Sequence, residues 1–506
     1  MSITIIDPIY GNVLFGDTDG VLANHDVGGA QVLTGGPNYV VGDARDMQGA
    51  AIGGKDNLWV VSDEFNGAAV AVGDSLNLGE TAQGGNDYMI VIAAAADPDR
   101  GDFPAFGDVG FGDALTMNGH AHGGRDVIIL DASGASASVY GDAYSMTDDA
   151  VGGNDGLGSS TTLRTGSDSL YGDAYSMTGR AKGGNDSLSS NASSAELWGD
   201  AGVMADNTVG GNDVLYGGRG SSTLIGDADS MTGAAKGGND RLIGGASDNS
   251  DSSFLFGDAF SLGTGTKGGD DVLTSGSTSD VMWGDAAQVA IGTVTGRDAF
   301  VFGANNGQDV VKDFRHGEDR IVIDVSTGIR TFDQLLPHLQ VASGGTLIAF
   351  GGLDQVRVEG VAKLTASDFV FGHGDTITGG AGGDSLSSLG GDNTYFGGAG
   401  SDSFVLKAKA LANSTGLGAG NSGADVAIQD FEGAGGWSAT GNDFIAFTGF
   451  GAGSTLTFDH FGQTGPSTDP TLQFYTLHDT TSGNDYSVFI HSLDGAKIAL
   501  GDFAFY

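Results

Sequence analysis

Two short aspartate motifs recur along the chain and carry the residue types that bind cations. The first is Gly-Asp, usually followed by Ala, and the second is Gly-Gly-x-Asp, usually Gly-Gly-Asn-Asp. In eight copies the second motif starts 11 residues after the first. Hard divalent cations prefer carboxylate oxygens together with the main-chain carbonyls that glycine-rich turns can aim inward. Both motifs are therefore candidate cation ligands.

The elements that position these motifs form an internal repeat. The motif pairs recur at intervals of 26 to 39 residues between residues 14 and 300. Self-similarity at this period predicts a solenoid, in which each coil buries its apolar face only against its neighbours. Degraded copies open at Gly16 and Gly284. The eight regular copies begin their two motifs at Gly42/Gly53, Gly73/Gly84, Gly112/Gly123, Gly141/Gly152, Gly172/Gly183, Gly199/Gly210, Gly226/Gly237 and Gly257/Gly268.

Each copy contains three short apolar segments separated by glycine-rich turns, and such segments predict strands. The residue after Gly-Asp is small, usually Ala. The residue five after the first Gly is always apolar: Val21, Met47, Leu78, Met117, Met146, Met177, Met204, Met231, Leu262 and Val289. Another apolar residue follows two after the second Asp: Leu58, Met89, Ile128, Leu157, Leu188, Leu215, Leu242 and Leu273. Two geometries fit a repeat of this length: one three-sided coil per copy, or one and a half turns of a flattened two-sided roll. We favour the single coil, because it places Asp over Asp.

An aspartate column of this kind needs a counter-charge. Stacked strands lie ~4.8 Å apart, so carboxylates in register repel one another unless a cation neutralises them. Calcium, which takes 6–8 oxygen ligands, suits such turns better than magnesium, which demands a tighter octahedron. Zinc is disfavoured because the chain has no Cys and its nine His are scattered. The residues therefore predict Ca²⁺ as the cofactor.

Two nonapeptides carry a family resemblance. Residues 379–387 (GGAGGDSLS) and 397–405 (GGAGSDSFV) match the G-G-x-G-x-D-x-U-x repeat. The chain therefore resembles the RTX (repeats-in-toxin) calcium-binding proteins. The resemblance implies glycine turns that bind calcium through the Asp and through main-chain carbonyls, and x-U-x segments that form a parallel β-roll. We expect an all-β fold, a parallel β-roll or β-helix solenoid with C-terminal β-rich modules.

The candidate ligands follow from the match to the nonapeptide Asp. In the repeat array they are Asp56, Asp87, Asp126, Asp155, Asp186, Asp213, Asp240 and Asp271, with Asn154, Asn185, Asn212 and Asn239 of the same turns. The nonapeptides add Asp384 and Asp402, and Gly-x-Asp settings add Asp309, Asp319, Asp425 and Asp443. The Asp of Gly-Asp-Ala is a second tier, because a turn Asp also bonds its own backbone: Asp43, Asp142, Asp173, Asp200, Asp227 and Asp258.

The repeat pattern changes at Arg297, and four domains are expected. Residues 1–296 form the repeat solenoid, with units of mostly 27–31 residues, and 372–405 form a short nonapeptide roll. Residues 297–371 resemble the module that follows RTX repeats in secreted proteases, and 406–506 are a second such module. The family resemblance makes the extreme C-terminus the uncleaved signal for type I secretion. The N-terminus lacks the basic and apolar regions of a signal peptide, in agreement with that route.

Composition narrows the partners. The net charge of -43 disfavours nucleic acid and anionic membrane surfaces, which are polyanions, and no sequence window approaches the length of a membrane span. We expect calcium ions and the type I secretion machinery as partners, with self-association into filaments or layers possible through open solenoid ends.

No catalytic residue is assigned from the sequence. The chain has no H-E-x-x-H metalloprotease motif, and His120 and His122 are an isolated pair. Residues 73–76 spell the Gly-Asp-Ser-Leu block of a hydrolase family, but they occupy a Gly-Asp-Ala slot and no Asp-x-x-His partner follows near the C-terminus. We therefore expect a non-enzymatic, secreted, extracellular or surface calcium-binding protein with a structural role in a surface layer, matrix or adhesion. The alternatives are a secreted effector or toxin-like protein acting on a host surface, and a hydrolase built on the solenoid.

Overall fold

The computed structural model describes residues 3–7, 11–35, 39–61, 70–93, 108–132, 137–159, 167–192, 194–246, 252–373, 376–387, 393–411, 424–434, 442–464, 467–499 and 501–506. Regular structure in these residues is almost entirely β, which confirms the predicted all-β class with long parallel sheets. The chain divides into two compact units. The first contains Met1–Phe300, Asn305–Asp319 and Gln340–Leu364; the second contains Val301–Ala304, Arg320–Leu339 and Thr365–Tyr506. Residues of the expected 297–371 module therefore occur in both units.

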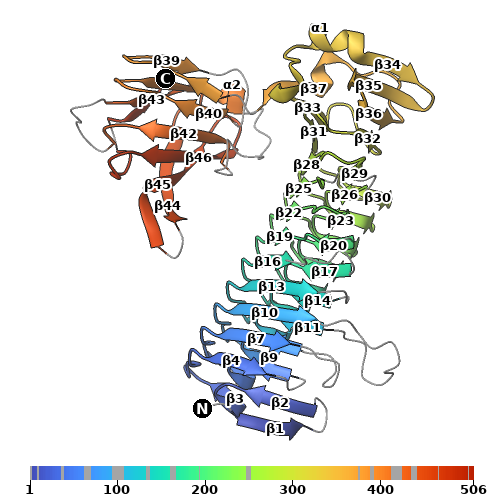
Figure 1. Cartoon of the computed structure of the whole chain (residues 1–506), viewed down its shortest axis with the longest axis vertical. Helices are drawn as coiled ribbons and strands as arrows, with labels where there is room; N and C mark the ends of the chain where they lie inside the picture. Colours follow the sequence, from blue (N-terminus) through green and yellow to red (C-terminus); the bar gives the residue numbers. More distant parts are fainter. Residues whose placement is uncertain are drawn as a thin grey trace. The chain divides into compact units, whose positions relative to one another are not determined.

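Three sheets build the first unit, and each copy of the repeat contributes one strand to each sheet (Figure 1). Sheet 1 contains, in spatial order, β1 (Ile3–Asp7), β2 (Gly11–Phe15), β5 (Tyr39–Val41), β8 (Val70–Val72), β11 (Asp108–Phe111), β14 (Ala137–Tyr140), β17 (Ser167–Tyr171), β20 (Ser194–Trp198), β23 (Ser221–Ile225), β26 (Phe254–Phe256), β29 (Val281–Trp283), β32 (Gln308–Val311), β36 (Asp354–Glu359), β35 (Gly345–Gly351) and β34 (Leu339–Ala342). Sheet 2 contains β4 (Val32–Gly35), β7 (Asn57–Val61), β10 (Tyr88–Ala93), β13 (Val127–Ala132), β16 (Gly156–Ser159), β19 (Ser187–Ser189), β22 (Val214–Tyr216), β25 (Arg241–Ile243), β28 (Val272–Thr274) and β31 (Ala299–Phe302). Sheet 3 contains β3 (Thr18–Ala23), β6 (Ala44–Gln48), β9 (Ser75–Leu78), β12 (Ala114–Met117), β15 (Ala143–Met146), β18 (Ala174–Met177), β21 (Ala201–Met204), β24 (Ala228–Met231), β27 (Ala259–Leu262) and β30 (Ala286–Val289).

Equivalent residues of successive copies pair directly. Met146 pairs with Met177 and Met177 with Met204 in sheet 3, and Leu188 pairs with Leu215 in sheet 2. The pairing is parallel throughout the array, so each copy makes one coil. The preference for one three-sided coil per copy is confirmed.

The stretch between the two motifs folds into a separate small lobe. Its core is a cluster of small and medium side chains, built in one copy from Ala174, Met177 and Ala181. These three are fully buried and repeat in the neighbouring coils. A second set of buried residues, such as Leu170 and Leu188, comes from sheets 1 and 2. Each coil therefore has two apolar regions, and the aspartate motifs lie where the chain passes from one to the other.

An aromatic ladder runs along the residues that precede Gly-Asp. The rings of Tyr140 and Tyr171 stack at 4.7 Å, and those of Tyr171 and Trp198 at 4.3 Å. Phe256 and Trp283 continue the series at 4.5 Å. Stacked rings in successive coils bury large apolar area at the entry to each Gly-Asp turn.

The first copy departs from the predicted core pattern. Leu22, not Val21, pairs with Met47, because the register shifts between Thr18 and Val21. Val21 is 51% exposed as a result. The shift moves every later side chain of β3 to the other face, as a one-residue slip must.

The second unit contains a different kind of coil. The strands from residue 376 to residue 448 alternate between two sheets and pair in parallel, so this part is a two-sided roll, in agreement with the parallel β-roll expected for the nonapeptide run. One sheet has β38 (Thr376–Thr378), β40 (Asn393–Phe396), β42 (Val426–Phe431), β46 (Asp485–Ser492), β45 (Ser467–His478) and β44 (Thr455–Thr464); the other has β39 (Ser385–Ser387), β41 (Ser403–Lys407), β43 (Phe444–Thr448) and β47 (Phe503–Phe505). A parallel pair, β33 (Arg320–Asp324) and β37 (Phe369–His373), also belongs to this unit.

Helical structure in the described residues is short. It comprises α1 (Phe332–Leu335), α2 (Ala408–Leu411), η1 (Val325–Thr327), η2 (Leu336–His338) and η3 (Ala366–Asp368). Thr331 caps the N-terminus of α1, where its side chain accepts a hydrogen bond from Gln334 N–H.

Candidate cation-binding columns

The Asp residues of Gly-Gly-x-Asp form one continuous ladder, here called the Gly-Gly-x-Asp column. In each coil the Oδ1 atom accepts a hydrogen bond from the main-chain N–H of the equivalent Asp one coil earlier. The N–H of Asp155 donates to Asp186 at 2.6 Å, and that of Asp186 donates to Asp213 at 2.7 Å. The structure brings all eight predicted array ligands into this column and adds two residues at its end: Asp56, Asp87, Asp126, Asp155, Asp186, Asp213, Asp240, Asp271, Asp298 and Asp319.

The second oxygen of these carboxylates is buried without a hydrogen-bond donor from the described residues. This holds for Oδ2 of each column member from Asp56 to Asp298. In a typical coil, a Cβ atom added at Gly172 would collide with both Asp186 Oδ2 and the Gly199 carbonyl oxygen of the next coil. A carboxylate oxygen and a main-chain carbonyl oxygen therefore meet beside the same glycine. These are the ligand types that calcium takes.

The Asp residues of Gly-Asp form a second ladder, here called the Gly-Asp column. The N–H of the second Gly in Gly-Gly-x-Asp donates to the Gly-Asp carboxylate of the same coil, as Gly184 does to Asp173 at 2.7 Å. The donor and acceptor are 11 residues apart in every regular copy, which is the constant spacing seen in the sequence. The column runs from Asp17 through Asp43, Asp74, Asp113, Asp142, Asp173, Asp200, Asp227 and Asp258 to Asp285.

Burial makes both columns costly in their charged form. It is the largest cause that raises the pKa of Asp56 to about 8 and that of Asp200 to about 6. The pKa of Asp213 lies well above its ordinary value because of burial and then the nearby charges of Asp200, Asp240 and Asp186. Carboxylates in such surroundings must be neutralised by protons or by cations.

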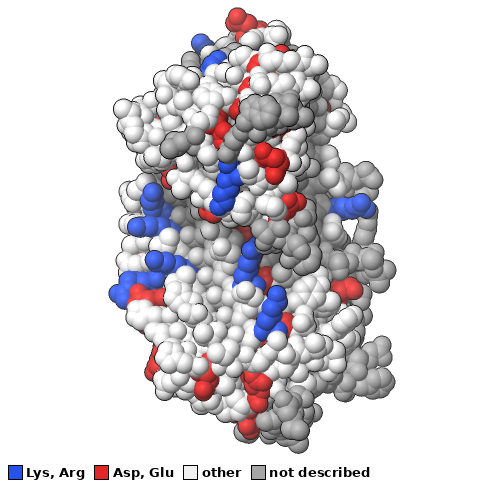
Figure 2. Space-filling view, turned by 90° about the vertical axis from the view of Figure 1, so that its left-hand side faces the viewer, with Lys and Arg blue, Asp and Glu red and all other residues white. Residues whose placement is uncertain are grey.

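Most aspartates of the two columns are buried, so they contribute little to the surface. Figure 2 shows one face of the molecule, on which Lys and Arg side chains and Asp and Glu side chains lie scattered among neutral residues. In the array, exposed Lys182 aligns with Val209, and Val209 with exposed Lys236. Much of the negative charge of the repeat therefore lies inside, in the two columns.

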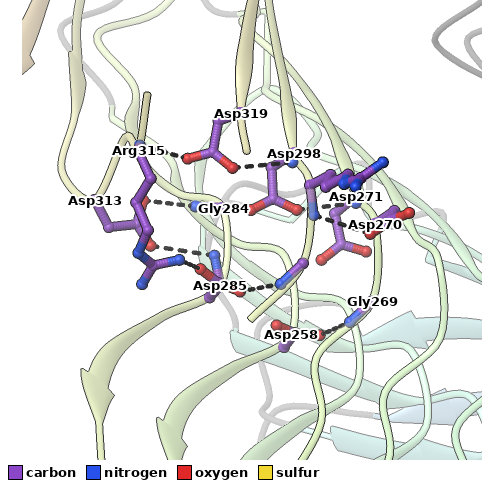
Figure 3. A network of polar contacts seen from close by, with 12 residues as sticks. Asp258, Gly269, Asp270, Asp271, Gly284, Asp285, Asp298, Asp313, Arg315 and Asp319 are labelled. Carbon is purple, nitrogen blue, oxygen red and sulfur yellow. Dashed lines mark hydrogen bonds and ion pairs between the residues drawn. The ribbon is translucent and has the colours of Figure 1, made fainter. Parts of the chain in front are cut away.

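The end of both columns is closed by residues that follow the array (Figure 3). Arg315 forms an ion pair with Asp285, whose side chain is 1% exposed. Asp313 accepts hydrogen bonds from the N–H groups of Gly284 at 2.8 Å and Asp285 at 3.1 Å. Asp319 accepts from Asp298 N–H at 3.2 Å and from Arg315 N–H at 2.6 Å. Burial is the main cause that raises the pKa of Asp313 to about 6 and that of Asp319 to about 7.

Sequence reasoning missed two of these residues. Asp298 follows a degraded Gly-Gly motif in which Thr295 replaces the first glycine, so the motif search passes over it. Asp313 lies in an Asp-Phe pair that recurs as Asp430-Phe431. In the second unit Asp430 accepts from Gly397 N–H at 2.7 Å and Gly398 N–H at 2.9 Å. The repeated Asp-Phe pair was the available signal, because both aspartates accept two consecutive main-chain N–H groups at a glycine turn.

Asp309 lies outside both columns. Its carboxylate accepts from Asp280 N–H at 3.0 Å, from Ser275 Oγ at 2.9 Å and from Asn306 Nδ2 at 2.7 Å. Burial raises its pKa to about 8. Its oxygens are thus already used within the protein.

The nonapeptide aspartates repeat the ladder in the second unit. Asp384 N–H donates to Asp402 at 2.8 Å, and Asp402 N–H donates to Asp443 at 2.8 Å. Asp402 is 1% exposed, and its Oδ2 is buried without a donor from the described residues. Asp425 instead accepts from Ser487 N–H at 2.6 Å and Ser487 Oγ at 2.8 Å. The same carboxylate-to-main-chain ladder thus occurs in a three-sided and in a two-sided coil.

The predicted asparagine ligands lie elsewhere. Asn154, Asn185, Asn212 and Asn239 are exposed. Their Oδ1 atoms accept from the main-chain N–H of the next coil, as Asn185 does from Asn212 at 2.7 Å. They form an outer amide ladder, separate from the buried carboxylate oxygens.

Other candidate chemistry in the described residues is limited. No group of three or more His, Cys, Asp or Glu side chains there could hold a metal ion by itself, so a bound cation needs carbonyl ligands as well. Ser75 of the Gly-Asp-Ser-Leu block is buried in sheet 3, and its Oγ donates to the Asn77 carbonyl at 2.9 Å. The His120 side chain is 68% exposed, 3.8 Å from Asp149.

Neither a protein-family model nor a curated protein sequence matches the chain. Among the described residues, none of the helices has the length and apolar character needed to cross a membrane.

Proposed function

We propose that this chain is a secreted, calcium-binding structural protein whose solenoid folds fully when calcium enters the Gly-Gly-x-Asp column. One observation carries the proposal. In every coil from Asp56 to Asp298 a buried carboxylate oxygen lacks a donor from the described residues. Beside Gly172 that oxygen, on Asp186, meets the carbonyl oxygen of Gly199.

The residues fit calcium in type. Asp186 Oδ2 and the Gly199 carbonyl would hold one ion, and equivalent atoms would hold one in other coils. The ion supplies positive charge that offsets the desolvated carboxylates. The chain positions the ligands through the Oδ1 hydrogen bond, which fixes each carboxylate against the coil before it. Because a cation that binds only the folded state adds its binding free energy to stability, folding becomes linked to calcium concentration.

The biological role in this proposal is assembly outside the cell. A highly acidic chain would be only weakly stable where calcium is scarce, pass unfolded through a type I secretion system and fold fully where calcium is abundant. Support for self-association comes from β3 and β30, the two outermost strands of sheet 3. They carry exposed Val21 and Val289 at 51% and 41%. No catalytic residue is part of this proposal.

The test is circular dichroism and thermal melting of the full chain at neutral pH, first in chelator and then in calcium. We expect calcium to increase the β signal and raise the melting temperature, and bound calcium to exceed several ions per chain by elemental analysis after dialysis. A full β signal in chelator, with a melting temperature that calcium leaves unchanged, would contradict the proposal.

A further inference from the structure

The Gly-Asp column has its own unsatisfied oxygens, distinct from those of the Gly-Gly-x-Asp column. One oxygen of each carboxylate accepts the hydrogen bond from the glycine N–H that closes the small lobe. The other oxygen is buried without a donor from the described residues in seven members: Asp43, Asp74, Asp142, Asp173, Asp200, Asp227 and Asp258. All seven residues are 0% exposed. Buried carboxylate oxygens in native proteins are normally paired, so a regular series of unpaired ones calls for a ligand.

The two ends of the column behave differently from the middle. Asp17 receives a hydrogen bond from Gln31 Nε2, and Asp285 receives the guanidinium of Arg315. The chain therefore supplies a donor or a cation of its own at both ends. Asp113 is the interior exception, because both its oxygens accept from Gly124 N–H, at 2.8 and 3.1 Å.

The unpaired oxygens point at the gap between successive coils. A Cβ added at Gly183 would collide with Asp200 Oδ1 and lie 2.5 Å from Asp173 Oδ2. The same arrangement holds at Gly152 between Asp142 and Asp173, and at Gly210 between Asp200 and Asp227. Two carboxylates from neighbouring coils thus face one spot beside a glycine that has no side chain to fill it.

We propose that these gaps form a second file of cation sites, in which a divalent, oxygen-seeking ion bridges the Gly-Asp carboxylates of two successive coils. The inference rests on the proposed function in that calcium would fill both files. One divalent ion for every two carboxylates balances the charge of the column, so alternate gaps need to be occupied. At the end of the array, the guanidinium of Arg315 supplies beside Asp285 the positive charge that the ion supplies in the gaps.

The test uses the full chain and the variant Asp200→Asn. The Asn oxygen can still accept from Gly211 N–H, which Asp200 now does at 2.7 Å. Its amide replaces the unpaired oxygen with a donor for the neighbouring carboxylates. The matched control is Asp229→Asn, which removes the same charge from an exposed residue of the next coil. Calcium is counted by elemental analysis after equilibrium dialysis, and melting temperatures are measured in chelator and in calcium.

We expect D200N to bind about one calcium ion fewer per chain than the wild type, and to melt at a higher temperature than the wild type in chelator. The control should match the wild type in its ion count. If the wild type binds calcium but D200N binds as many ions, the second file does not exist and the proposed function survives. If the wild type binds no calcium, the proposed function itself fails.

A second measurement covers the case in which D200N does not fold. In wild-type crystals grown with calcium, anomalous scattering should place an ion between Asp200 and one of its two neighbours in the column, Asp173 or Asp227. Anomalous peaks beside Asp186 and Asp213 alone would overturn the second file.

Discussion

The N–H of Gly184 donates to the carboxylate of Asp173 at 2.7 Å, across 11 residues of chain. This bond closes the small lobe around Met177, and its counterpart occurs in each regular coil. The spacing between the two motifs is therefore set by a hydrogen bond that pins one turn to the other. The copies differ in length only in the stretch outside the lobe.

Single-residue insertions should destabilise the protein inside the lobe and have little effect on stability in the stretch outside it. One Ala inserted between Tyr175 and Ser176 shifts Met177 to the other face of β18 and breaks the register of the lobe. We expect a loss of at least about 2 kcal/mol, the lower range for removing a buried Met. The control insertion between Asp248 and Asn249 lies in the stretch where the copies differ in length and should change stability little. The melting temperatures of both variants test this prediction. Equal melting temperatures would show that the hydrogen bond between Gly184 and Asp173 does not fix the length of the lobe.

Glycine is required at positions such as Gly183, where carboxylates of two successive coils lie against the main chain. Gly183→Ala places a methyl group against Asp173 and Asp200, and the backbone must move to relieve the collision. Overpacking of this kind costs about 1–3 kcal/mol. In Gly156→Ala the nearest atoms lie 3.9 Å or farther from the new Cβ, so we expect a change within about 1 kcal/mol. Urea unfolding midpoints of the two variants provide the comparison; a stable G183A protein would show that the gap has room to spare.

The ladder and the cation make separable contributions at Asp213. Asp213→Ala removes the acceptor of Asp186 N–H, and a buried donor left unpaired costs about 1–3 kcal/mol. Asp213→Asn keeps an acceptor oxygen. We expect both variants to lose part of the calcium-induced rise in melting temperature, whereas only the Ala variant is also less stable than the wild type in chelator. Equal stability of the two variants in chelator would show that the hydrogen bond contributes nothing.

The column aspartates also predict how stability depends on pH without calcium. The folded-state pKa is raised to about 6 for Asp43 and Asp200, about 7 for Asp319 and about 8 for Asp56, in each case mainly by burial. A raised folded-state pKa means that the folded chain binds more protons than the unfolded chain, so stability falls as pH rises. In chelator the melting temperature should therefore fall between about pH 4 and pH 8, and calcium should flatten the curve. A melting temperature in chelator that rises over this range would show that the columns are not protonated in the metal-free fold.

Much of the fold was predictable because its signals are local. Apolar residues at fixed offsets from each motif, such as Met177 and Leu188, predict the strands and their stacking. The partners of the aspartates were not predictable in the same way. Whether Asp173 bonds to Gly184, and whether Asp186 accepts from Asp155, depends on pairings between turns that only the three-dimensional coil brings together. The sequence ranked Asp173 below Asp186, yet both have a buried oxygen without a donor from the described residues.

The asparagines of the second motif differ from the neighbouring aspartates in burial. Asn185 lies one residue before Asp186, and its place in the motif suggested a shared ligand role. In a strand-like segment neighbouring side chains point to opposite faces, so Asn185 lies outside while Asp186 is buried. The roles of the residues at the end of the columns could not be predicted from neighbouring residues either. Asp313 accepts hydrogen bonds from the N–H groups of Asp285 and Gly284, which lie 28 and 29 residues away in sequence.

Arg315 offers a last test, because it neutralises a column member with a side chain. Arg315→Ala leaves the Asp285 carboxylate, 1% exposed, without its guanidinium. Removing one partner of a fully buried pair costs about 3–5 kcal/mol; Arg315 is 33% exposed, so solvent screening reduces this, and we expect more than about 1 kcal/mol. Arg180→Ala is the control, since Arg180 is 69% exposed in its pair with Asp149 and an exposed ion pair contributes little to stability. Calcium should restore the melting temperature of R315A more than that of R180A, because an ion can then occupy the position of the guanidinium beside Asp285. If calcium stabilises the two variants equally, Arg315 does not substitute for an ion at the end of the column.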